Sequence, residues 1–271
     1  MNETTQKAIR PDLATFPVFA LIVTSRSDKA LTHVYHSTIQ PQWLSGAELA
    51  HFMEEYLKQR GKAQLLNESE LLYASGHLSN LLLEIQRQRY STTALFAKLY
   101  AEVLIAEIEG KAAEKMPTNV PDLMLCYLNE LNAKIAGDRL DDPIVHQDAK
   151  IIAWECLKQN YRPTPAKIED IKLALRGNDV DTRIQYLERR LYLIKVTEPA
   201  KDRIYFDLDP LAEYLASLYL IERYRNDDKA WHSLLGHLKT LSTTSEIPSG
   251  FLLALHNCCT SKQNEFHVPS F

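Results

Sequence analysis

The sequence lacks the features that mark several common classes of protein. Only 8 of its 271 residues are glycine, too few for an all-β protein built from many tight turns. Its 4 cysteines comprise one adjacent pair and two inside apolar helical patterns, which is not a disulfide framework. No run of about 18 apolar residues occurs, so we expect no transmembrane helix. These absences favour a cytoplasmic protein with reduced thiols.

Charge and the first residues exclude further classes. The formal net charge is -4 at pH 7, so the chain has no basic surplus of the kind that attracts nucleic acid. Residues 1–12, MNETTQKAIRPD, are polar and include acids, so we expect no signal peptide. We therefore expect neither a membrane nor a nucleic acid as partner.

Apolar residues recur mostly with the period of a helix, which predicts a mainly α fold. Two exceptions precede residue 45: the apolar run Phe16–Val23, typical of a strand covered on both faces, and Ser37–Leu44, an edge strand because of Pro41. The expected helices are residues 47–61, 68–86, 92–109, 121–134, 142–157, 164–177, 180–189, 209–224, 228–241 and 249–259. Asn119 and Ser91 are expected caps, and Ile144, Ile151, Ile152 and Leu157 are expected to be buried.

The segment from Arg203 to Leu220 combines a strand with a helix start. Arg203–Phe206 alternates polar and apolar residues, as a half-buried strand does. Asp209 is expected to cap the following helix, with Pro210 at its first position. A second apolar run, Leu191–Val196, lies before the turn-forming TEPAKD, so the two runs predict a β-hairpin. Two helices followed by a hairpin are the outline of a winged helix.

These segments resemble the C-terminal part of the nucleotide-binding module of NACHT-type STAND NTPases. The strand ending ALIVTSR resembles a sensor strand of that family, which implies that Thr24, Ser25 and Arg26 lie near the γ-phosphate of a bound nucleotide. The family's aromatic strand end and F-x-E-Y-L-A helix are matched here by Phe206, Leu211, Glu213, Tyr214, Leu215 and Ala216.

The resemblance covers roughly residues 16–224 and implies four regions. Residues 1–44 correspond to the truncated end of an α/β nucleotide-binding domain, 45–160 to a helical lid domain, 161–208 to a winged helix, and 209–271 to a C-terminal helical segment. The function implied is that of a signalling or regulatory module.

Several departures from the family argue against catalysis. No G-x-x-x-x-G-K-[ST] sequence occurs, and both Gly61-Lys62 and Gly110-Lys111 are followed by alanine. No apolar strand ends in paired acids that would hold Mg²⁺. Leu208 stands where the family has a phosphate-binding histidine, and residues 90–93 contain no lid proline. We therefore expect no enzyme and no cofactor, with ATP bound only if a partner chain supplies the phosphate loop.

Two alternative functions remain open. The first is a winged-helix DNA-binding regulator using Arg189, Arg190, Lys195, Lys201 and Arg203, although Glu188, Glu198 and Asp202 offset this charge. The second is a helical protein–protein interaction scaffold. A metal site is not expected, because the spacing of His256, Cys258, Cys259 and His267 matches no common zinc pattern.

The apolar strand Phe16–Val23 favours a protein partner or self-association. A strand of this composition needs neighbouring strands on both sides. The sequence offers at most one weak candidate before Ala47. Unpaired N–H and C=O groups on such a strand can pair with another chain.

Overall fold

The computed structural model describes residues 37, 44, 46–87, 93–110, 116–244 and 248–262. Contacts divide the chain into two units, Met1–Gln42 and Trp43–Phe271. All described residues except Ser37 belong to the second unit, which is the one described below.

Part of the expected nucleotide-domain edge falls outside the described residues. This applies to the predicted strand Phe16–Val23 and to Thr24, Ser25 and Arg26. Of the predicted edge strand Ser37–Leu44, only the two end residues are described. The expected cap Ser91 also lies outside the described residues, so these expectations stay predictions.

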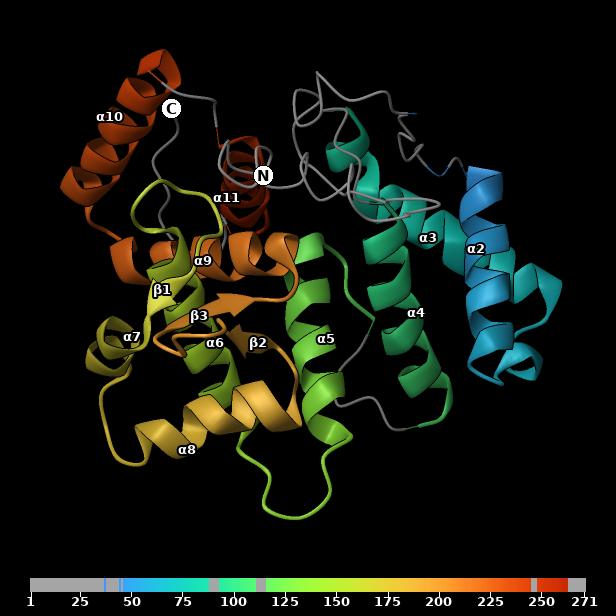
Figure 1. Ribbon diagram of the computed structural model, residues 1–271. Coiled ribbons are helices and arrows are strands. Elements are labelled where there is room, and N and C mark those ends of the chain that lie inside the picture. The colour runs from blue at the N-terminus through green and yellow to red at the C-terminus, as the bar shows by residue number, and fades with distance from the viewer. Residues whose placement is uncertain are drawn as a thin grey trace. The chain divides into compact units, whose positions relative to one another are not determined.

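The described part of the chain is mainly helical, as predicted, and contains one small sheet (Figure 1). The helical elements are α2 (Gly46–Gln59), η1 (Ala63–Leu65), α3 (Glu68–Arg87), α4 (Thr93–Ile108), α5 (Val120–Ala133), α6 (Asp142–Leu157), α7 (Ile168–Leu175), α8 (Val180–Gln185), the π-helical turn η2 (Tyr186–Arg190), α9 (Asp209–Tyr224), α10 (Asp228–Thr244) and α11 (Ser249–Ser261). The strands are β1 (Ala166–Lys167), β2 (Ile194–Val196) and β3 (Arg203–Phe206). Within the described residues, no helix is both long and apolar enough to span a bilayer.

The three strands form an antiparallel sheet in the order β1-β3-β2. The predicted hairpin is confirmed: β2 pairs with β3, and Lys195 lies opposite Tyr205. The prediction of a helix from residue 164 is wrong at its start, because Ala166 pairs with Ile204 of β3. Helix α7 therefore begins only at Ile168, whose N–H donates to the carbonyl oxygen of Asp202 at 2.9 Å.

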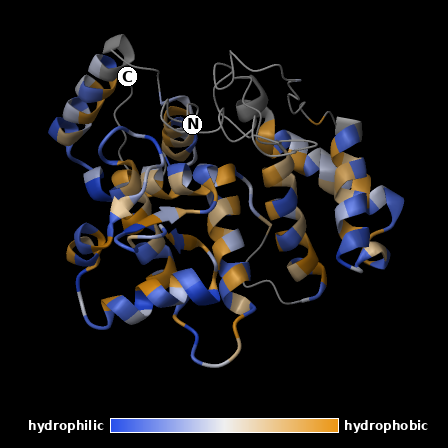
Figure 2. Cartoon of the chain, in the orientation of Figure 1, coloured by the Kyte–Doolittle hydropathy of each residue, from blue (hydrophilic) through white to orange (hydrophobic). Residues whose placement is uncertain are grey.

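Helix α9 is the central helix of this unit. It contacts α5, α6, α10, α11 and β3, and its contact with α6 is the most extensive between any two elements of the described residues (Figure 1). Leu211, Leu215 and Leu220 on this helix have no exposed surface. Most other helices expose one face, so both hydrophilic and hydrophobic residues appear on them in Figure 2. The fold is thus organised around a buried helix.

Two expected details of the helices are wrong. The cap of α9 is Leu208, whose carbonyl oxygen accepts the N–H of Ala212, so Asp209 is already the first helical residue. Its carboxylate still lies in the first turn, where the helix dipole favours negative charge. Ile144, expected to be buried, is 38% exposed, because its neighbour Val145 takes the inward position at 1% exposure. By contrast, Asn119 caps α5 as predicted, accepting the N–H of Asp122.

A buried carboxylate, that of Glu102 on α4, joins three helical segments. It accepts a hydrogen bond from Tyr56 on α2 and forms ion pairs with Arg60 (Nε–Oε1, 3.0 Å) and Lys134, the C-cap of α5. Burial acts to raise its pKa, but hydrogen bonds from Lys134 and Tyr56, together with the nearby positive charges, hold the pKa of Glu102 below its usual value. These hydrogen bonds and ion pairs therefore stabilise the charged form of Glu102.

The pKa of Glu130 on α5 is shifted in the opposite direction from that of Glu102. It is 5% exposed, and burial raises its pKa above the usual value, with Lys134 only partly offsetting this. The pKa values of these two glutamates near Lys134 are thus shifted in opposite directions, because Tyr56 and Lys134 donate hydrogen bonds to Glu102.

We predict opposite effects on stability for two matched substitutions at these glutamates. At pH 7 Glu102→Gln should lower the free energy of unfolding by about 1–3 kcal/mol, since it removes charge-assisted hydrogen bonds. Glu130→Gln should leave it unchanged or raise it, because a buried charge is removed. A glutamate whose pKa is depressed by folding, such as Glu102, contributes stability above its unfolded pKa of about 4.3 and loses this contribution as the pH falls through its folded pKa. A glutamate whose pKa is raised by folding, such as Glu130, contributes stability below its unfolded pKa and loses it as the pH rises through its folded pKa. In urea melts from pH 7 to pH 3, the difference in unfolding free energy between each variant and the unsubstituted protein should become smaller as the pH falls. Equal effects of the two substitutions at pH 7 would contradict the opposite pKa shifts of Glu102 and Glu130.

We also predict that Leu215→Ala lowers the free energy of unfolding by about 2–5 kcal/mol, because it leaves a cavity at a fully buried position of α9. Leu173→Ala is the matched control, since Leu173 is 78% exposed on α7. That change should alter the free energy by less than about 0.5 kcal/mol. Denaturant melts compare the two, and similar losses would show that α9 is not packed as described.

Candidate functional site

The residues that match the family helix lie at the junction of β3 and α9. Phe206 ends β3 and is 3% exposed, whereas Leu211 and Tyr214 on α9 are 0% and 2% exposed. Glu213 is partly exposed. The structure brings all four residues into one region, but it buries three of them among protein side chains.

Tyr214 links α9 to two other helices. Its hydroxyl oxygen accepts a hydrogen bond from Asn257 Nδ2 of α11 at 2.7 Å. Its ring meets that of Phe96 on α4 edge to face, with 6.2 Å between the centroids. Burial raises the pKa of Tyr214 well above its usual value, so the hydroxyl stays neutral. Tyr214 therefore has a packing role that requires both its ring and its hydroxyl.

Glu213 lies against the first turn of α11. A Cβ atom on Gly250 would come within 2.3 Å of Glu213 Oε1, so the glycine leaves room for the carboxylate. The N-cap of α11 is Pro248, which makes no side-chain cap hydrogen bond. A carboxylate at this position interacts favourably with the N-terminal end of the helix dipole. Two adjacent residues of the family-like helix, Glu213 and Tyr214, therefore both contact α11.

Further contacts fix α11 along its length. The Phe251 ring stacks on that of Tyr161, with 5.3 Å between the centroids. At the other end, Lys262 Nζ lies 3.6 Å from Asp122 Oδ1 in the first turn of α5. Phe251, Ala254 and Cys258 have no exposed surface. Helix α11 is therefore part of the core and not an appended tail.

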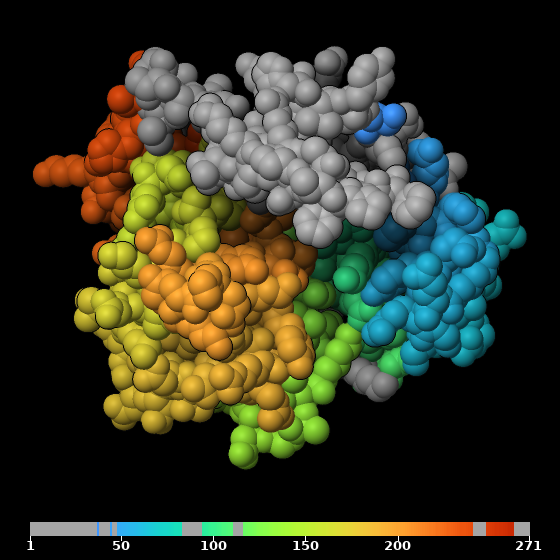
Figure 3. Space-filling view, in the orientation of Figure 1, coloured from blue at the N-terminus to red at the C-terminus, as the bar shows by residue number. Residues whose placement is uncertain are grey.

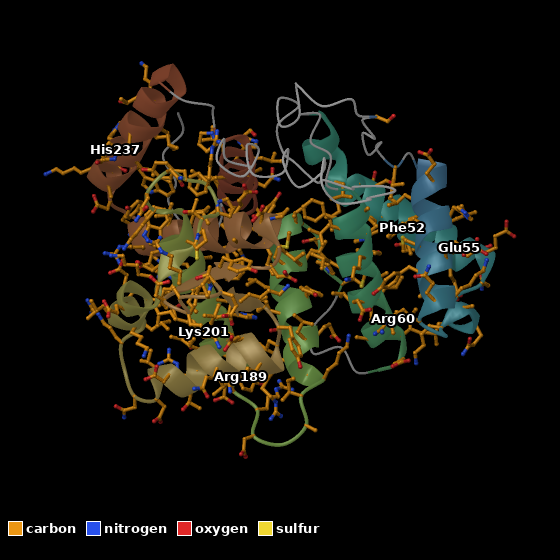
Figure 4. All side chains as sticks on the ribbon, viewed as in Figure 1. Phe52, Glu55, Arg60, Arg189, Lys201 and His237 are labelled. Atoms are coloured by element: carbon orange, nitrogen blue, oxygen red, sulfur yellow. The ribbon has the colours of Figure 1, made fainter. Side chains whose placement is uncertain are left out.

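The cations of the expected DNA-binding set do not form a continuous positive surface. Each of them lies close to a protein oxygen. Four pair with a carboxylate: Arg189 with Glu188, Lys195 with Asp207, Lys201 with Glu198, and Arg203 with Asp202. Arg190 donates a hydrogen bond to the carbonyl oxygen of Ala136. Arg189 and Lys201, labelled in Figure 4, come from η2 and from the hairpin turn. The neighbouring acids largely cancel the charge that a phosphate backbone would require.

A shallow pocket of about 380 Å³ lies where η2 meets the hairpin. It is lined by Glu188, Arg189, Tyr192, Ile194, Lys195, Val196 and Tyr205. The corresponding segments lie on the visible face in Figure 3, in yellow and orange. Sequence reasoning missed Tyr192 and Tyr205 as site residues, because it assigned Tyr192 to a strand beginning at Leu191. The strand begins at Ile194, and Tyr192 has a positive φ of 52°.

Three members of the cysteine and histidine set lie on α11, and they differ in burial. His256 is exposed, Cys258 is fully buried and Cys259 is intermediate, whereas His267 lies outside the described residues. Burial raises the pKa of Cys259 to about 11. In the described residues no group of three or more histidines, cysteines or acids is arranged to hold a metal ion.

We predict that Tyr214→Phe lowers the free energy of unfolding by about 1–3 kcal/mol, because the buried Asn257 amide loses its partner. Tyr219→Phe on the same helix is the matched control, since the Tyr219 hydroxyl accepts only an exposed hydrogen bond from Arg223. It should cost less than about 0.5 kcal/mol. Thermal or urea melts separate the two, and a neutral Tyr214→Phe would contradict a structural role for this hydroxyl.

One comparison with known proteins gave a match. Residues 246–271 match the family described as NACHT C-terminal Helical domain 4. The described part of this segment, residues 248–262, contains the whole of α11. No curated protein and no solved structure matches the chain. The family match lies outside the region of sequence resemblance, residues 16–224, and it supports a NACHT-related protein.

Proposed function

We propose that this protein is a non-catalytic signalling or regulatory module related to NACHT-type STAND NTPases. One observation carries the proposal: the helix that matches a NACHT C-terminal helical domain, α11, packs on the helix that bears the family-like motif, α9. The two similarities were found in separate parts of the sequence. Their contact through Glu213 and Tyr214 supports reading them as parts of one module.

In this proposal residues 161–208, which run from β1 to β3, are a winged helix. Its element order, β1-α7-α8-η2-β2-β3, gives a short strand, two helices with a π-helical turn, and a hairpin. The strand order β1-β3-β2 places the first strand beside the last, which supports this interpretation. Residues 45–160, which include α2–α6, take the part of the lid, and within it Glu102 of α4 pairs with Arg60 after α2 and with Lys134 at the end of α5. Thr24, Ser25 and Arg26 are the proposed nucleotide sensors.

The proposed role is regulatory because phosphoryl transfer depends on groups that the sequence lacks. Catalysis of that reaction rests mainly on a phosphate loop and on bound Mg²⁺. Neither the loop motif nor paired metal-binding acids occur in the sequence. We propose that a protein partner in the cytoplasm supplies the phosphate loop if ATP is bound. In such a complex the lid and winged helix would close over the nucleotide as a two-state hinge.

We predict that the purified protein releases no phosphate from ATP or GTP above background in the presence of Mg²⁺. An Arg26→Ala variant serves as control, because any contaminating enzyme would be unaffected by it. Release that co-purifies with the protein through successive columns and saturates with nucleotide would contradict the non-catalytic proposal. The measurement is a phosphate-release assay at several protein concentrations.

A further inference from the structure

The pocket between η2 and the hairpin has a feature that the fold itself does not require. Tyr192 is 74% exposed and has a φ of 52°. A left-handed backbone costs a residue other than glycine roughly 1–2 kcal/mol. Within the described residues the Tyr192 side chain has neither a hydrogen bond nor a ring contact. Its large aromatic ring is therefore held in solvent, at an energetic cost, beside a pocket.

The lining of the pocket combines apolar and charged side chains. Ile194 is 1% exposed, and Val196 and Tyr205 are partly exposed. The charged lining residues are two cations, Arg189 and Lys195, and one carboxylate, Glu188. The pocket lining is thus partly apolar, and its charged residues give it an excess of one positive charge.

Both cations can exchange their present carboxylate partner for a carboxylate on a ligand. The Arg189 side chain is 71% exposed, and its Nε lies 3.6 Å from Glu188 Oε2. Lys195 is 50% exposed and pairs with Asp207, which is 45% exposed. Exposed pairs of this kind contribute little to stability, so an incoming carboxylate can replace the present partner at little cost.

We propose that this pocket binds an extended segment of a partner protein, with an aromatic or aliphatic side chain next to an aspartate or glutamate. The apolar side chain fits between Tyr192 and Tyr205, and the acid pairs with Arg189 or Lys195. A nucleic acid fits less well, because the exposed cations of η2 and the hairpin are each paired with an acid, namely Glu188, Glu198, Asp202 or Asp207. These acids would repel a run of phosphates, whereas the proposed ligand brings a single carboxylate. The inference goes beyond the proposed function and does not depend on a nucleotide or on the winged-helix interpretation.

The test is a selection from a random 12-residue phage-displayed peptide library against the immobilised full chain. The proposal expects enrichment of an aromatic or aliphatic residue adjacent to Asp or Glu. Binding of the enriched peptide, measured by fluorescence polarisation, should weaken at least tenfold in Tyr192→Gly and in Arg189→Glu. Leu173→Ala, which removes a 78%-exposed apolar side chain elsewhere, should leave it unchanged. Replacing the peptide's acid by lysine should restore binding to Arg189→Glu.

A second measurement distinguishes a binding role from a structural one. Glycine adopts a positive φ without strain, so Tyr192→Gly should keep or raise the melting temperature while it abolishes peptide binding. A marked fall in melting temperature would show that Tyr192 supports the fold and would overturn the proposal. The absence of an enriched motif, or binding unaffected by both variants, would also overturn it. So would a salt-sensitive complex with a DNA duplex that both variants abolish.

Discussion

The burial of helix α9 is the constraint on which the rest of this unit depends. Its side chains pack against α5, α6, α10 and α11 and reach the sheet through β3. A helix covered on so many sides must be apolar around most of its circumference, and the sequence LAEYLASLYLI meets this requirement. The few polar residues it buries are hydrogen-bonded: Ser217 donates to the Glu213 carbonyl oxygen, and Tyr214 accepts from Asn257. The other helices can expose one face because α9 supplies a common core.

This arrangement changes the meaning of the motif that first suggested the NACHT family. Leu208 cannot replace a phosphate-binding histidine, whereas Glu213 and Tyr214 are engaged with α11. In the described residues the motif therefore holds the C-terminal helix in place. Because that helix lies in the segment that matches a NACHT C-terminal helical domain, the motif and the match are physically coupled.

The sequence predicted the helices better than it predicted surface geometry, and the reason is physical. Apolar periodicity specifies which residues face the core, so α2, α5 and α9 begin within one residue of their expected starts. The start of α7 was misplaced because Ala166 is held by the distant Ile204, a contact that local patterns do not encode. The pocket was missed for a similar reason. It depends on the left-handed backbone at Tyr192, and no glycine or asparagine marks that position.

The central claim is that α11 forms one cooperative core with α9, so that the family match and the family-like motif belong to a single folded unit. Native-state hydrogen exchange of the full chain tests it most directly, because it measures the free energy of opening at each amide. The account predicts that the slowest amides of α11, around Ala254 and Cys258, exchange with the same opening free energy as those around Leu215. Fast exchange throughout α11, with α9 still protected, would show that the C-terminal helix is a separate element and would contradict the claim.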